Sequence, residues 1–144
     1  MFYGFHRTEA IASFKKALLF DSTNAACYLG LVLCYAPNIN AVPYRQIPVV
    51  FTFLEKSKLY APYAGEFEKV LIDAQLSRFT LDTTISRQQL NGAYAIALKK
   101  VYQQFPQNPD AGALYADALM QLHPGIYMIR MATLKNGLAR SKAC

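Results

Sequence analysis

The side chains that could hold a metal ion are few and widely spaced. The two histidines, His6 and His123, lie near opposite ends of the sequence, and no Cys-x-x-Cys or His-x-x-x-His pair is present. A site built on one loop or one helix needs such close spacings, because its ligands must converge on one ion. The sequence therefore predicts no metal site.

Acidic residues form one cluster, which consists of Glu66, Glu68 and Asp73. Glu66 and Asp73 could share a helix face, as a general acid and base pair requires. The favoured interpretation is structural: carboxylates in the first turn suit the positive end of the helix, and the remainder form a solvated face. An enzyme or cofactor-binding domain framed by helices stays open as the less favoured alternative.

Nucleophile and phosphate motifs are absent from the sequence. The seven glycines form no G-x-G-x-x-G sequence, P-loop or G-x-S-x-G elbow. Ser13 falls within an expected helix without a nearby histidine, so nucleophilic catalysis has no basis there. We assign no catalytic residue and expect no cofactor.

Three cysteines are present, an odd number. Cys27 and Cys34 would lie about 10 Å apart along one helix face, too far for a disulfide. We expect them to act as small buried apolar residues rather than redox groups. Cys144 is expected to be exposed.

The net charge of +6 first suggests a nucleic-acid partner. No acidic residue follows Asp117, however, and the last residues carry four basic ones, Arg130, Lys135, Arg140 and Lys142. Residues 124–144 are therefore expected to be a basic tail, poorly ordered or aberrant, and residues 1–123 a helical domain. Because no basic stripe alternates with aromatic residues, we expect no nucleic-acid partner.

Apolar spacing predicts about six helices, over residues 7–20, 25–36, 44–59, 64–79, 87–105 and 110–122. The third is the least certain, and we expect it to be kinked or restarted at Pro48. Thr23 or Asn24 is expected to cap the second helix, and Ser86 with Gln89 has the spacing of a capping box. Arg78 ends an apolar stripe, where it is expected to snorkel or to pair with an acid such as Asp82.

One pattern of residue types occurs twice in the sequence. An Ala-Ile-Ala triplet, a Lys-Lys pair, a phenylalanine, a polar turn, an alanine and a tyrosine recur in that order, over residues 10–28 and 95–115. The offset from Ala25 to Ala111 is 86 residues, which is no multiple of the roughly 34-residue tetratricopeptide period. The repetition is therefore irregular, with an insertion between its copies.

These residues resemble tetratricopeptide repeats. The small-large-small signature of the second helix of a repeat is matched by Ala10, Phe14 and Ala17. The aromatic and leucine positions of the next first helix are matched by Tyr28, Leu31 and Tyr35. Asp21-Ser22 departs from the usual Asp-Pro of the family, and Val32 replaces its usual small glycine.

A narrower resemblance is to a family of bacterial tetratricopeptide proteins of largely undefined function. It is carried in the same order by residues 4–11, 28–30, 36–40, 68–79, 93–98 and 105–124. The resemblance implies an all-α, irregular stack of antiparallel helices, an α-solenoid fragment whose packing partner before Met1 is missing. The resemblance also favours an exported or periplasmic location. No signal peptide is visible in the sequence, however, so the compartment stays open.

The resemblance implies a noncatalytic scaffold that binds a protein or peptide segment in a concave groove. The groove would be lined by residues 25–36 and 110–122, with Leu29 and Leu33 as candidate contacts. Asn38 and Asn40 are further candidates, although their expected role is to bond the backbone at a turn. The alternative is a structural fragment of a longer solenoid, partnered by neighbouring repeats. No apolar run is long enough to span a membrane.

Overall fold

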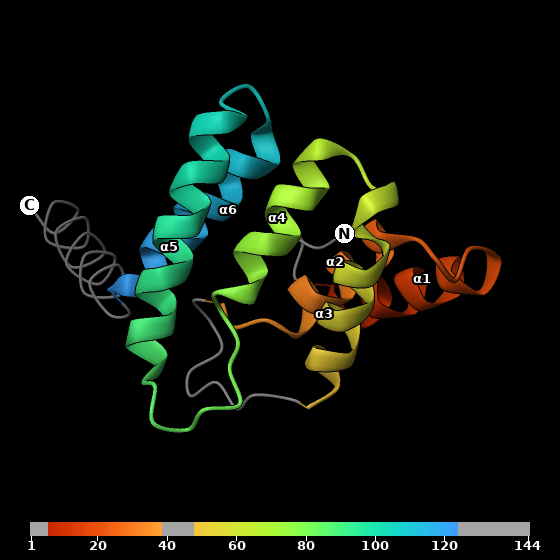
Figure 1. Cartoon of the computed structure of the whole chain (residues 1–144), viewed down its shortest axis with the longest axis horizontal. Coiled ribbons are helices and arrows are strands. Elements are labelled where there is room, and N and C mark those ends of the chain that lie inside the picture. Colours follow the sequence, from red (N-terminus) through yellow and green to blue (C-terminus); the bar gives the residue numbers. More distant parts are fainter. Residues whose placement is uncertain (1–5, 39–47, 124–144) are drawn as a thin grey trace, which may run out of the picture.

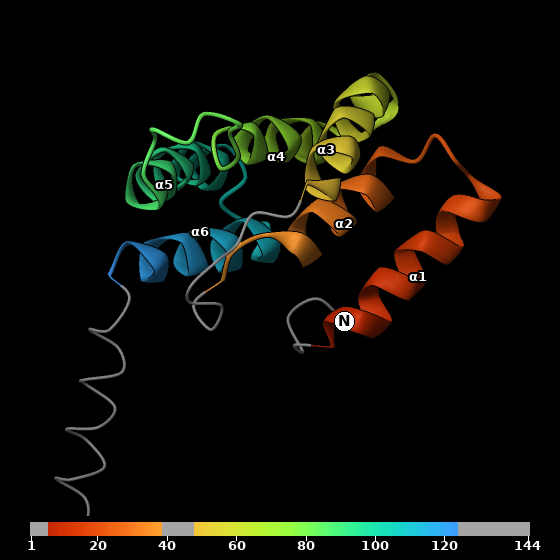
Figure 2. The ribbon, with the colours of Figure 1, turned by 90° about the horizontal axis from the view of Figure 1, so that it is seen from below.

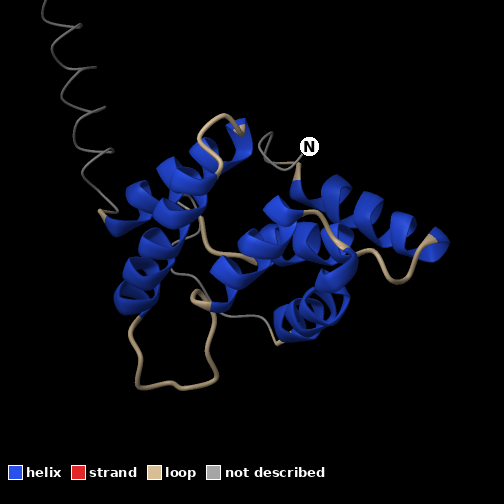
Figure 3. Ribbon diagram, turned by 45° about the horizontal axis from the view of Figure 1, so that its top comes forward, coloured by secondary structure: helices blue, strands red, loops and turns tan. Residues whose placement is uncertain are grey.

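Every regular element of the described chain is helical. A computed structural model describes residues 6–38 and 48–123, and these ranges contain no strand (Figure 1 and Figure 3). The elements are, in order, α1 (Arg7–Phe20), α2 (Ala25–Tyr35), α3 (Val49–Tyr60), the 3-10 helix η2 (Ala61–Tyr63), α4 (Glu66–Leu76), α5 (Arg87–Gln104) and α6 (Pro109–Leu122). The predicted all-α class is confirmed.

The helices lie in two layers. In the view of Figure 2, α3, α4 and α5 form one row, and α1, α2 and α6 form the other, with α2 in the middle. Seven of the eleven residues of α2 are buried. Its sequence is apolar almost all round, which is what a helix covered on several sides requires.

Two apolar clusters meet on α2. The main cluster joins α2, α4, α5 and α6 around the fully buried Tyr94 and Leu98. The second packs Val32 of α2 against Val50 and Leu54 of α3. In contrast, Ala10 is the one buried residue of the fourteen in α1, so α1 is an edge helix.

The hairpins α1–α2 and α5–α6 turn in the same way. In the first turn, the amide of residue 21 donates to Ala17 O, residue 24 to Asp21 O, and residue 28 to Asn24 O. The same three bonds recur 84 residues later, donated by residues 105, 108 and 112. An asparagine caps the second helix in both, since Asn24 Oδ1 accepts from Cys27 N at 3.0 Å and Asn108 Oδ1 from Ala111 N at 3.2 Å. Hydrogen bonding therefore fixes the register at 84 residues, rather than the 86 suggested by matching alanines.

The other helix ends follow from local signals. Ser86 and Gln89 form the predicted capping box of α5, with Ser86 N to Gln89 Oε1 at 2.9 Å and Gln89 N to Ser86 Oγ at 3.2 Å. The α4 helix ends at Leu76, earlier than predicted, because Ser77 and Arg78 donate to carbonyls three residues back and tighten the last turn. The described part of α3 begins at Val49, directly after Pro48. The predicted start at residue 44, Asn40 and the predicted tail, residues 124–144, lie outside the described residues.

Candidate functional site

An apolar pocket opens between both layers, and we call it the leucine pocket. Its volume is about 180 Å³. Four helices contribute to it: α1, α2, α4 and α6. Its lining consists of Phe14, Gly30, Leu33, Phe67, Leu71, Asp110 and Leu114. Because an empty cavity of about 150 Å³ is enough to bind benzene, this pocket has room for one large apolar side chain.

Large apolar side chains and one glycine shape the leucine pocket. Leu71 and Leu114 are buried and form its base, whereas Leu33 and Phe14 are half-buried. Gly30 has no side chain, so the Phe14 ring lies directly against the α2 backbone. A methyl group at Gly30 would come within 2.6 Å of Phe14 Cε1, which real structures do not tolerate. The glycine thus permits α1 and α2 to approach here.

Among the described residues, Asp110 is the one charged residue that lines the leucine pocket. It lies four residues before Leu114 on α6 and therefore on the same helix face. Its amide donates to Asn108 Oδ1 at 2.9 Å, which places it in the capped first turn. Its exposed carboxylate accepts no hydrogen bond and forms no ion pair with the residues described.

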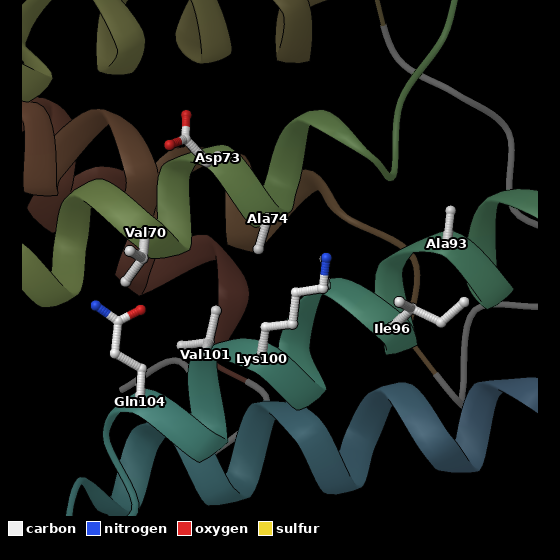
Figure 4. Close-up of a pocket in the computed structure, with 9 residues that line it drawn as sticks. Val70, Asp73, Ala74, Ala93, Ile96, Lys100, Val101 and Gln104 are labelled. Atoms are coloured by element: carbon white, nitrogen blue, oxygen red, sulfur yellow. The ribbon is translucent and has the colours of Figure 1, made fainter.

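A second depression runs between α4 and α5, with a volume of about 380 Å³ (Figure 4). Its charged lining residues are Asp73 of α4 and Lys100 of α5. In Figure 4 the Asp73 carboxylate points away from α5, so these two groups do not converge. Glu66, the suggested acid–base partner of Asp73, instead pairs with Lys69 at 2.8 Å and lies outside this depression. The arrangement lacks the convergent polar groups of a catalytic site.

The four predicted contact residues lie in different environments. Leu33 lies in the leucine pocket. Leu29 is 5% exposed within the main core cluster, so in this fold it has no free surface for a ligand. The expectation that it lines a groove is corrected on this ground: α4 and its neighbours cover that side of α2. Asn38 is half-buried after α2, engaged in an interaction of its own, and lines neither depression. Asn40 is outside the described residues.

Sequence reasoning missed most of the leucine pocket. Phe14 was expected only as the large residue of the small-large-small signature, and neither Phe67 nor Leu71 was a candidate contact. The signal that could have pointed to the pocket is Gly30, a small residue in an otherwise bulky helix opposite an aromatic one. The positions of Leu71 and Asp110 follow only from how α4 and α6 meet α2.

A buried arginine lies among α4, α5 and α6. Arg78 is 2% exposed, and its guanidinium carbon lies 4.2 Å from the centre of the Tyr94 ring. Nη2 donates to the carbonyl of Pro37 and, at 3.0 Å, to Gln121 Oε1. Its own carbonyl accepts from Arg87 Nη1 at 2.8 Å. Arg78 thus joins the ends of α2 and α4 to α5 and α6.

The prediction that Arg78 snorkels or pairs with Asp82 is wrong. The Asp82 carboxylate is exposed and accepts from Thr84 N at 2.8 Å. The partners of Arg78 are 41 and 43 residues away in the sequence, and one is a backbone carbonyl, which no residue type marks. Charge matching along the sequence therefore pointed to the wrong neighbour.

Further polar groups extend this network. Gln75 Nε2 donates to Tyr94 Oη at 2.9 Å, and Gln121 Nε2 donates to Asp117 Oδ2 at 2.5 Å. Asn91 joins it through Nδ2, which donates to the carbonyl of Gln121 at 3.4 Å. Three buried atoms of the network have no partner among the described residues: Gln75 Oε1, Arg78 Nε and Asn91 Oδ1. Neither depression is lined by the residues of this network. The network therefore helps to set how these helices meet.

Burial controls the titration of the groups that could otherwise react. Burial raises the pKa of the Asp117 carboxyl, and this outweighs the attraction of Arg78. Burial likewise raises the pKa of the Cys27 and Cys34 thiols, both of which are free. A raised pKa favours the protonated thiol. Burial of Cys34 agrees with the expected role of a small apolar residue, whereas Cys27 is only half-buried.

No group of three or more metal-binding side chains occurs in residues 6–38 and 48–123. His6 Nδ1 lies 4.0 Å from Glu9 Oε2 at the exposed start of α1, and His123 is exposed after α6. None of the helices described there is long and apolar enough to cross a membrane. Comparison with protein-family models, curated proteins and solved structures finds no match for this chain.

Proposed function

We propose that the chain is a noncatalytic helical scaffold that binds a protein or peptide segment through the leucine pocket. The observation that carries the proposal is the pocket itself: the hairpin α1–α2 and the later helices α4 and α6 surround one apolar depression of side-chain size. Sites of this type anchor a partner by one buried apolar side chain, while the surrounding contacts exclude water.

A tetratricopeptide-like stack is the finer form of this proposal. The two hairpins with the same turn support it, as does the place of α2 and α6 in the pocket lining, where the resemblance puts the groove. Two regular periods would separate the hairpins by about 68 residues. The observed 84 leaves about sixteen extra residues between the two hairpins.

A second candidate is a structural part of a longer solenoid, and one observation favours it. Leu19 and Phe20 at the end of α1 are both 84% exposed. An apolar helix edge of this kind suits a neighbouring repeat. This candidate predicts that the isolated chain unfolds without a single cooperative transition, which chemical denaturation followed by circular dichroism and tyrosine fluorescence would reveal.

The test of the binding proposal is selection from an unbiased dodecapeptide library, followed by calorimetric titration of the enriched peptides. Leu33→Gln places a polar group in the leucine pocket, and Leu119→Gln makes the same change on α6 outside it. We expect Leu33→Gln to weaken binding about tenfold or more, because a buried apolar anchor is lost, and Leu119→Gln to leave it unchanged. Circular dichroism checks that both variants fold.

Two results would contradict the proposal: no peptide is enriched, or the enriched peptides bind both variants with the affinity of the wild type. If Leu33→Gln does not fold, cross-saturation from the peptide to the unmodified protein locates the contact instead.

A further inference from the structure

We infer that the ligand of the leucine pocket is a peptide segment in which a large apolar side chain stands beside a lysine or arginine. This inference rests on the proposed function and names its ligand class. It follows from the one charged group of the pocket, Asp110, and from the apolar surface next to it.

The apolar part of the ligand follows from the size and lining of the pocket. Leu33, Leu71 and Leu114 leave a space of about 180 Å³ that no described side chain fills. A leucine, methionine or phenylalanine side chain matches this volume, and its transfer from water into an apolar pocket is favourable. A small or polar side chain would leave the space unfilled or would lose its hydrogen bonds to water.

The basic part follows from the charge at the rim of the pocket. Asp110 lies one helical turn from Leu114 and forms no ion pair or side-chain hydrogen bond with the residues described. The positive end of α6 offsets only part of its charge, and the Asn108 side chain already accepts from the first amides. The rim is therefore negative, and it attracts a cation while repelling an acidic peptide.

Charges elsewhere on these helices do not change this conclusion. Glu66 and Lys69, beside Phe67 on α4, neutralise each other in an ion pair of 2.8 Å. Lys15 and Lys16 follow Phe14 on α1 but do not line the pocket. An apolar residue and an adjacent base can therefore engage Leu33 and Asp110 together.

The experiment compares peptides selected by the wild type with those selected by Asp110→Asn. Asp73→Asn, the same change in the depression of Figure 4, is the control. We expect wild type and Asp73→Asn to enrich peptides with lysine or arginine within two residues of a large apolar residue. Asp110→Asn should keep the apolar residue and lose the base.

A double-mutant cycle then measures the pair itself. For the best peptide, Asp110→Asn and replacement of its base by glutamine should each weaken binding about threefold to fivefold, and the two together no more than either alone. Added salt should weaken binding of the wild type and not that of Asp110→Asn.

The outcomes separate the inference from the proposed function. If selected peptides bind and lose affinity with Leu33→Gln but show no preference for a base, the inference is overturned and the proposed function stands. If no peptide binds, or Leu33→Gln binds as well as the wild type, the proposed function is overturned and the inference with it.

Discussion

The hairpins α1–α2 and α5–α6 share one turn but differ in how they are covered. Phe105, which follows α5, packs edge-on against Phe67 with ring centres 5.4 Å apart. Phe20, which ends α1 one position before Asp21, the counterpart of Phe105 in the register of 84 residues, is 84% exposed. In the register of 84 residues, Leu98 is fully buried and its counterpart Phe14 is half-buried. Local sequence thus determines the turn, whereas neighbouring helices determine burial.

The difference has a structural cause. α5 lies between α4 and α6 and packs against both, whereas α1 packs mainly against α2. The main core cluster accordingly draws on α2, α4, α5 and α6, and α1 supplies none of its buried residues. The leucine pocket lies on the less covered side, where Phe14 meets Gly30.

The largest expected effect is on the free energy of unfolding, and it distinguishes α1 from α5, the first helices of the two hairpins. Leu98→Ala should lower the free energy of unfolding by about 3 kcal/mol, because it leaves a cavity in the core. Phe14→Ala removes a larger side chain, yet should cost less than about 2 kcal/mol because that side chain is only half-buried. Urea denaturation measures both. A greater loss for Phe14→Ala would show that α1 belongs to the core.

The glycines of the two hairpins should respond in opposite directions. No atom of the described residues lies within 4 Å of a methyl group added at Gly92 of α5. Gly92→Ala should therefore stabilise the protein by about 0.5–1 kcal/mol through helix propensity. Gly30→Ala should destabilise it by about 1 kcal/mol or more, because the methyl group meets the Phe14 ring. Stabilisation by both would mean that Phe14 moves away at little cost.

The asparagine caps test whether the turns are equivalent. Asn24→Ala and Asn108→Ala should each lower the unfolding free energy by about 1 kcal/mol, because each leaves an amide of the first helical turn without its partner. The two losses, measured by thermal or urea denaturation, should agree within about 0.5 kcal/mol. A marked difference would break the equivalence.

The smallest expected effect is the pH dependence of stability that Asp117 causes. In the register of 84 residues, Asp117 occupies the position of Leu33. Because burial raises the pKa of Asp117 in the folded protein, that state holds the proton more tightly than the unfolded chain. Stability should fall as the pH rises from the ordinary value of 3.8 through the raised pKa. Asp117→Asn should remove this fall and be at least as stable as the wild type at pH 7. A clear loss of stability there would show that attraction to Arg78 outweighs burial.

Much of the fold could be predicted from the sequence, because helix ends carry local signals. The bounds of α1 match the prediction, and Asn24 and the Ser86–Gln89 box cap the helices expected. Burial of Arg78 could not be predicted, since its partners are 41 and 43 residues away. Of the leucine pocket, only Leu33 was anticipated as a contact. The other walls depend on how α1, α4 and α6 meet α2, which periodicity within one helix does not encode.

The most direct test of the binding proposal is a methyl nuclear magnetic resonance titration of the unmodified protein with the tightest selected peptide. The proposal predicts the largest shift changes and intermolecular contacts at the methyl groups of Leu33, Leu71 and Leu114. The methyl groups of Ile96 in the α4–α5 depression and of Leu119 should stay unchanged. Changes centred on Ile96, with Leu33 unaffected, would contradict it.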